Sequence, residues 1–206
     1  MTRCLRMTSL VLAVLLCLRA VSAFAASSPE ESIYRLQEGV DNAETERVLS
    51  YLDIDQVVGR ALDAALKHEE VLRITKQNPP LALALSLGGG LGTGIIQDFL
   101  TAEVKQFVLY GVSSGAFAGR PHSGKPKPGG LMDGLLRGGA KDRKIFGEAI
   151  TRHREGDTAL VSTSLFDAGS GETYPLELKL ERQNSLWRVM EITNIQQHIN
   201  RVAGAQ

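Results

Sequence analysis

Hydrophobic positions in the first part of the chain recur at the spacing of α-helices. Between residues 28 and 66, apolar side chains return every three or four positions, which places them on one face of a helix. The apolar positions are Ile33, Leu36, Val40, Val48, Leu49, Leu52, Ile54, Val57, Val58, Ala61, Leu62, Ala65 and Leu66. Ser28 before Pro29, and Asp53 with Gln56 three residues further on, are typical helix starts. The pattern predicts two helices before Asp53 and a longer one after it.

The middle of the chain is less regular. Asn78-Pro79-Pro80 breaks it, because a proline disfavours the helical conformation of the residue before it. Residues 81–96 are apolar and rich in glycine, and we expect a loosely helical buried segment there. A helix is expected to begin again at Thr101 and to give way from Gly111 onward. Residues 119–130 form a basic stretch rich in proline and glycine, which predicts a mobile loop.

The last third of the chain changes to the period of β-strands. Apolar and polar side chains alternate strictly at residues 174–181, the pattern of a half-buried strand. Further strands are expected at 145–151, 157–166 and 186–192, with a turn at 183–185 and a closing helix that carries Ile195, Ile199 and Val202. Helices followed by a meander of strands predict an α+β fold: N-terminal helices packed on a curved antiparallel sheet of about four strands, with a C-terminal helix.

The N-terminal residues have the pattern of a secretory signal peptide. Arg3 and Arg6 precede an apolar run at residues 9–18, and small residues follow. Cleavage is expected after Ala23 or Ala25, which leaves residues 26–206 as a single α+β domain in a periplasmic or secreted location. The apolar run is about ten residues, shorter than the roughly 20 that span a bilayer. A lipid-anchored alternative is disfavoured, because Leu16 and not a small residue precedes Cys17.

Composition narrows the function classes of the mature chain. Both cysteines, Cys4 and Cys17, lie in the signal, so disulfide and thiolate chemistry are not expected. Loss of the signal's three arginines leaves 20 basic and 23 acidic residues, a net charge of −3. A nucleic-acid-binding protein should instead show a basic surplus. No apolar run of the mature chain reaches membrane-spanning length without interruption, so we expect no transmembrane segment.

Three short patterns suggest chemistry but have simpler explanations. The glycine-rich stretch at residues 87–94 lacks the Lys-Ser/Thr of a phosphate-binding loop. Asp53 and Asp55 suit a helix cap and its first turn. His153, Glu155 and Asp157 read as a hairpin turn with solvated flanks. We therefore expect no metal, no cofactor and no catalytic residues, and interpret the chain as not an enzyme.

Several of these patterns together resemble an exported bacterial family, the domain of unknown function 2939. The matching features are Tyr34, Asp41, the step Tyr51-Leu52-Asp53, Asn78-Pro79, the strand around 176–180, Trp187, and Ile192-Thr193-Asn194 before a helix. The chain also resembles the nuclear-transport-factor-2-like cone, in which helices close over a curved sheet, often around an apolar pocket. More loosely, it is similar to periplasmic phospholipid carriers of the toluene-tolerance type. These resemblances imply a fold and a cavity but no catalytic residues.

The sequence therefore favours a secreted domain that binds a ligand or a protein partner. An alternative is a carrier for a lipid or another apolar small molecule, with a cavity lined by Leu85, Leu87, Ile95, Phe99, Phe107, Val108, Leu178 and Met190. A second alternative is a small hydrolase or isomerase on the same fold, which needs an acid inside the cavity: Asp53, Asp98 or Glu191. Trp187 is interpreted as a core residue, with a place on the cavity wall as the alternative.

Overall fold

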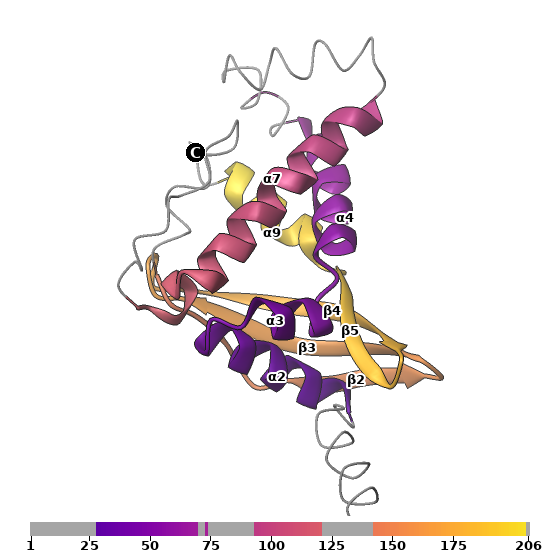
Figure 1. Ribbon diagram of the computed structural model, residues 1–206. Helices are drawn as coiled ribbons and strands as arrows, with labels where there is room; N and C mark the ends of the chain where they lie inside the picture. Colours follow the sequence, from indigo (N-terminus) through magenta and orange to yellow (C-terminus); the bar gives the residue numbers. More distant parts are fainter. Residues whose placement is uncertain (1–27, 70–72, 74–92, 121–141, 205–206) are drawn as a thin grey trace, which may run out of the picture.

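The computed structural model of the protein describes residues 28–69, 73, 93–120 and 142–204 (Figure 1). Its helices are α2 (Pro29–Asp41), α3 (Thr45–Tyr51), α4 (Ile54–Leu66), α7 (Thr93–Ser113), the 3-10 turn η2 (Ala116–Ala118) and α9 (Ile195–Gly204). Its strands are β1 (Lys144–Phe146), β2 (Ile150–Glu155), β3 (Thr158–Asp167), β4 (Glu172–Gln183) and β5 (Leu186–Ile192). This is the predicted α+β fold, with helices on a curled antiparallel sheet and a helix at the C-terminal end.

The first helices begin where the sequence predicts. The Ser28 hydroxyl accepts a hydrogen bond from the Glu31 amide at 3.2 Å, and Pro29 occupies the first helical position. Asp53 caps α4 in the same way, through the Gln56 amide at 3.1 Å. These caps satisfy backbone donors that have no partner inside the helix. They therefore set where each apolar face begins.

The sheet is a meander in which β3 lies beside β4 and β4 beside β5, while β1 and β2 share the other side of β3. Leu176, Leu178 and Leu180 of β4 are buried, and the alternate positions face outward, as the strict alternation predicts. The β4–β5 turn falls after Gln183, where Asn184 and Ser185 take positive φ angles. The hydrophobic core lies between α2, α3 and the inner face of the sheet, and Ile33 and Trp187 are both fully buried in it.

The prediction of one strand at residues 145–151 is wrong, because the structure divides it into β1 and β2. Phe146 pairs with Leu165 and Ile150 with Ser162, so three residues lie opposite two on β3. One extra residue on one of two paired strands is the definition of a β-bulge. Gly147 allows it: its amide donates to the Ser164 carbonyl at 2.8 Å, and a Cβ there would lie 2.3 Å from the Ser164 hydroxyl.

Helix α7 also differs from the prediction, since it already includes Thr93 rather than beginning at Thr101. Leu100 is buried one position before the predicted start, and this burial favours a continuous helix. The helix continues past Gly111 to Ser113. A Cβ at Gly111 would lie 2.3 Å from the Phe117 ring, so this glycine gives the ring room to pack on the helix. The predicted features at 78–92 and nearly all of the predicted 119–130 loop lie outside the described residues.

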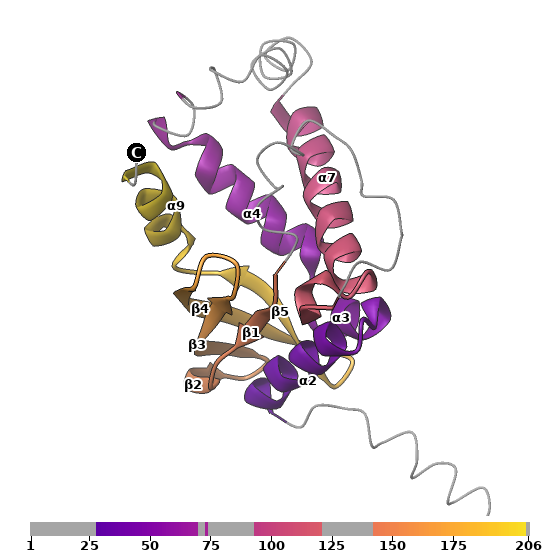
Figure 2. The same cartoon turned by 90° about the vertical axis from the view of Figure 1, so that its left-hand side faces the viewer.

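The helices form two layers beside the sheet. Helices α2 and α3 run along it, whereas α4, α7 and α9 rise from one side (Figures 1 and 2). The chain between α3 and α4 covers the outer edge of β5: Leu52 forms a parallel bridge with Val189, and the Asp53 amide donates to the Val189 carbonyl at 2.9 Å. Pairing this edge removes open hydrogen-bonding groups and fixes the start of α4 against the sheet. Of the helices in the described ranges, none is long and apolar enough to cross a membrane.

Candidate functional site

An apolar cavity of about 360 Å³ lies between the inner face of the sheet and the helices. Its described lining is Leu36, Val40, Val48, Leu52, Val57, Phe107, Val108, Val112, Phe117, Lys144, Phe146, Leu165, Leu176, Leu178, Val189 and Ile192. These residues come from α2, α3, α4, α7, η2 and four strands, so the cavity is the place where both helix layers meet the sheet. Its volume is at the lower end of the range of about 300–1,000 Å³ typical of small-molecule sites.

The wall of this cavity is partly buried rather than sealed. Val112 and Leu178 are buried, but Val57, Phe107 and Val108 remain half-buried. The Phe107 and Phe117 rings meet edge to face, with 6.1 Å between their centroids, and hold the α7 side of the wall. Half-buried apolar side chains around a hollow are unusual in a protein interior, which is normally close-packed.

Lys144 is the one charged residue in the described lining, and its charge is already paired. Its ammonium group donates to the Asp167 carboxylate, and both side chains are mostly buried. Burial alone would raise the pKa of Asp167, but hydrogen bonds from Lys144 and from the Gly169 amide outweigh it and hold that pKa below its ordinary value. The Lys144 stem therefore contributes apolar wall, as long cationic side chains commonly do.

Three of the cavity residues expected from the sequence, Phe107, Val108 and Leu178, line this cavity. Phe99 is outside the described lining: it lies on α7 with 49% of its surface exposed. Met190 is buried but also outside it, with its sulfur 3.8 Å from the Gln183 side-chain nitrogen. The register of β4 and β5 shifts beside Met190, so simple alternation misjudges which way it faces.

The remaining expected lining residues cannot be compared, because Leu85, Leu87 and the side chain of Ile95 lie outside the described part of the chain. Most of the residues that line the cavity are not among those expected from the sequence. Leu36, Val57 and Leu176, for example, were assigned only to apolar faces of helices and strands. The signal that could have found them is that every such face must meet another, and the cavity lies where several meet.

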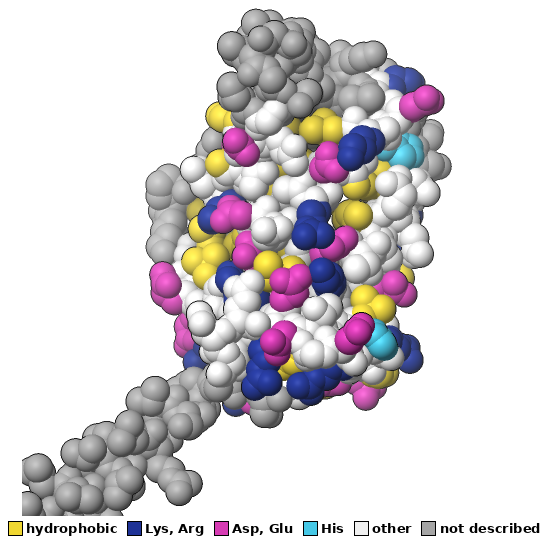
Figure 3. Space-filling view, turned by 90° about the vertical axis from the view of Figure 1, so that its right-hand side faces the viewer, with side chains coloured by type: hydrophobic (Ala, Val, Ile, Leu, Met, Phe, Trp, Pro, Cys, Tyr) yellow, Lys and Arg dark blue, Asp and Glu magenta, His cyan; other side chains and the backbone are white. Residues whose placement is uncertain are grey.

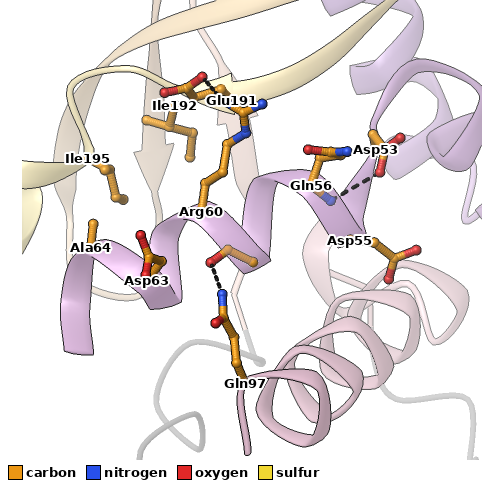
Figure 4. Close-up of a pocket in the computed structure, with 11 residues that line it drawn as sticks. Asp53, Asp55, Gln56, Arg60, Asp63, Ala64, Gln97, Glu191, Ile192 and Ile195 are labelled. Carbon is orange, nitrogen blue, oxygen red and sulfur yellow. Dashed lines mark hydrogen bonds and ion pairs between the residues drawn. The ribbon is translucent and has the colours of Figure 1, made fainter. Parts of the chain in front are cut away.

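A second, polar cleft of about 700 Å³ lies along α4, next to the end of β5 (Figure 4). Its described lining is Asp53, Asp55, Gln56, Gly59, Arg60, Asp63, Ala64, Gln97, Glu191, Ile192 and Ile195. Arg60 crosses it to pair with Glu191, and Gln97 of α7 donates to the Gly59 carbonyl at 3.0 Å. The cleft is thus framed by α4, α7 and the C-terminal end of β5.

The acids of this cleft each have a basic partner. The Lys105 ammonium nitrogen lies 2.6 Å from a carboxylate oxygen of Asp55, and the Lys67 ammonium nitrogen lies 2.6 Å from one of Asp63. Arg188 lies 3.6 Å from the Asp53 carboxylate. Acidic and basic side chains accordingly lie beside one another over this face of the molecule (Figure 3). The more exposed pairs, those of Asp55 and Asp63, contribute only about 0–1 kcal/mol each.

The acids named for a catalytic alternative do not lie in the apolar cavity. Asp53 and Glu191 line the polar cleft, and Asp98 is exposed on α7 outside both linings. His153 and Glu155 are exposed on β2, 4.0 Å apart, and Glu155-Gly156-Asp157 forms the hairpin turn that the sequence indicates. Across the described ranges, no group of three or more His, Cys, Asp or Glu residues is arranged to hold a metal. Trp187 is fully buried and is not in the described cavity lining.

Comparison of the chain with protein-family models, with curated proteins and with solved structures gave no match. The resemblance to the domain of unknown function 2939 and to the nuclear-transport-factor-2-like cone therefore stays a prediction from the sequence.

Proposed function

We propose that this protein is a non-enzymatic binding domain that holds an apolar small molecule in the cavity between its sheet and its helices. One observation carries this proposal: fifteen of the sixteen described residues around a hollow of about 360 Å³ are apolar. Water gains no hydrogen bonds from such a wall, so an apolar guest that displaces it is favoured. Each buried methylene group contributes about 0.8 kcal/mol to binding.

The volume narrows the class of ligand. A site at the lower end of the usual range suits a single alkyl chain or a compact ring system. It does not suit the whole of a lipid with two long chains. We therefore favour a carrier or sensor of single-chain or small cyclic apolar molecules. An exported location, periplasmic or secreted, is part of this proposal, supported by the signal-like residues 1–25.

The ligand proposal is tested by native mass spectrometry of the protein purified under mild conditions, compared with its denatured mass. A reproducible extra mass that leaves on denaturation is expected, together with binding of a neutral naphthylamine fluorescent probe. The Val108→Phe variant should lose both, because the larger ring fills the cavity. Val104→Phe is the matched control, since Val104 lies on the same helix, half-buried and outside the described lining.

Two results would overturn the proposal. One is a protein that carries no extra mass and binds no probe. The other is equal binding by Val108→Phe and Val104→Phe, which would move the binding site away from the cavity. The exported location is checked by expressing the whole chain in a bacterial host. An intact mass that lacks residues 1–23 or 1–25 is expected, and an uncleaved chain in the cytoplasm would contradict it.

A further inference from the structure

Part of the cavity wall is aromatic. Phe107 of α7, Phe117 of η2 and Phe146 of β1 all line the cavity. The rings of Phe107 and Phe117 meet edge to face, with 6.1 Å between their centroids. The elements η2 and β1 both contact α2, and η2 also contacts α7. The three rings therefore come from neighbouring elements of the fold.

Contacts of the surrounding chain hold two of these rings in place. The Phe117 ring packs where Gly111 of α7 has no side chain, since a Cβ there would lie 2.3 Å from it. The backbone of Phe146 is held by Gln37 of α2: its amide donates to the Gln37 side-chain oxygen at 2.8 Å, and the Gln37 side-chain nitrogen donates to the Lys144 carbonyl at 3.2 Å. The aromatic wall is thus formed before a ligand binds, which lowers the cost of binding.

The rest of the lining is stiff and offers a ligand no hydrogen bonds. Six of the sixteen described lining residues are valines, whose branched side chains have restricted χ1 angles. The described lining contains no methionine, the apolar side chain that adapts most readily to different shapes. Lys144 directs its ammonium group to Asp167. A polar group of a ligand would therefore lose its hydrogen bonds to water without replacing them, and this favours a neutral ligand.

Phenylalanine gives the wall a preference that leucine or valine would not. An aromatic ring has a negative face and a positive edge, so two rings attract each other in edge-to-face or offset arrangements beyond the effect of buried area. A saturated ring of the same size gains the burial but not this attraction. Three phenylalanines around one cavity therefore favour an aromatic guest over a saturated one.

We propose that the ligand is a neutral aromatic molecule of the alkylbenzene type, whose ring packs among Phe107, Phe117 and Phe146. This inference rests on the proposed function, since it needs an apolar molecule bound in the cavity. It adds the class of that molecule and names the side chains that select it.

The test uses ethylbenzene and ethylcyclohexane, which have the same carbon skeleton and differ in aromaticity. The affinity of each is measured by displacement of the neutral naphthylamine probe from the parent protein and from Phe107→Leu and Phe146→Leu. For each hydrocarbon, the ratio of parent to variant affinity is then taken. The transfer of the hydrocarbon out of water is the same for both proteins, so this ratio does not contain its hydrophobicity.

The loss of affinity is expected to be about twofold to tenfold larger for ethylbenzene than for ethylcyclohexane in each variant, because leucine keeps an apolar wall but removes the aromatic contact. The two variants lie on different elements, so the test remains if one of them does not fold. Phe166→Leu is the matched control: Phe166 lies on β3, 37% exposed and outside the described lining. It should leave both affinities unchanged.

The outcomes separate this inference from the function on which it rests. If neither hydrocarbon displaces the dye from the parent protein, the proposed function itself fails. If both hydrocarbons bind the parent but lose affinity equally in the folded leucine variants, or if Phe166→Leu gives the same selective loss, the cavity stands and the aromatic assignment is overturned. A larger loss for ethylbenzene, confined to the variants of the cavity wall, supports the assignment.

Discussion

The guanidinium of Arg154 lies over the indole ring of Trp187, 4.9 Å from its centroid. Arg154 is on β2 and Trp187 is on β5, at opposite sides of the sheet path. The sheet must therefore curl far enough to bring these strands within side-chain reach. This curl makes the inner face concave, and the concave face forms one wall of the apolar cavity.

Removing the tryptophan should destabilise the protein strongly. Trp187 is fully buried, so Trp187→Ala is expected to lower the free energy of unfolding by about 3–5 kcal/mol. Arg154→Ala should cost about 0.5–1 kcal/mol, the range of an exposed cation–π contact. Urea denaturation of both single variants and the double variant measures their coupling. A coupling energy near zero would show that the stacking contributes nothing to stability.

The length of the ligand chain should set its affinity until the cavity is full. Each added methylene contributes about 0.8 kcal/mol, so the affinity for a homologous series of single-chain apolar ligands should rise about fourfold per carbon. Beyond the length that the cavity accepts, the rise should stop. Titration calorimetry over the series measures both the slope and the length at which it ends. A slope that never levels off would indicate binding to an open surface.

The Lys144–Asp167 pair should contribute stability that acid removes. The pKa of Asp167 is lowered in the folded protein, so this contribution is present above the unfolded-state pKa of about 3.9. It is lost as the pH falls from there through the lower, folded-state pKa. Asp167→Asn should thus be less stable than the parent at neutral pH, with the difference shrinking below about pH 4.

Thermal melts between pH 7 and pH 3 measure this difference. Asp157→Asn is the matched control, because Asp157 is exposed in the β2–β3 turn. A gap between Asp167→Asn and the parent that stays constant over this pH range would mean that the variant acts through packing and not through the charge.

Two helix glycines should respond in opposite ways to alanine. A Cβ at Gly111 would lie 2.3 Å from the Phe117 ring, so Gly111→Ala should cost about 1–3 kcal/mol. Gly59 of α4 has nothing within 4 Å of such a Cβ, so Gly59→Ala should stabilise the protein by about 0.5–1 kcal/mol. Chemical denaturation compares them directly. Stabilisation by Gly111→Ala would show that the Phe117 ring moves away at little cost.

The helix starts and the inward faces of the strands can be predicted from short stretches of sequence. Ser28 and Asp53 cap helices because a side-chain oxygen needs to reach only three residues ahead. The inward residues of β4 are fixed by strict alternation, since successive side chains of a strand point to opposite faces. The α+β class follows from the order of these elements.

Where a local pattern is compatible with two structures, tertiary packing determines which of the two forms. Residues 145–151 suit a single strand, but the close contact of Gly147 with Ser164 places a bulge there. Thr101 and Glu103 suit a helix start, but burial of Leu100 favours a helix that has already begun. Strict alternation predicts that Met190 faces the cavity, but the register of β5 shifts beside it. Met190 is buried outside the described cavity lining.

By itself, the sequence determined which side of a regular helix or strand is apolar, because that depends only on the period of the chain. It could not determine what each apolar side would meet. Val108 and Leu178 are 70 positions apart, and Arg60 and Glu191 are 131 apart. Only the tertiary structure decided that the first two face one hollow and that the second two meet beside it. The physical reason is that a cavity is the space left where several apolar faces meet without filling it, and no single face contains that information.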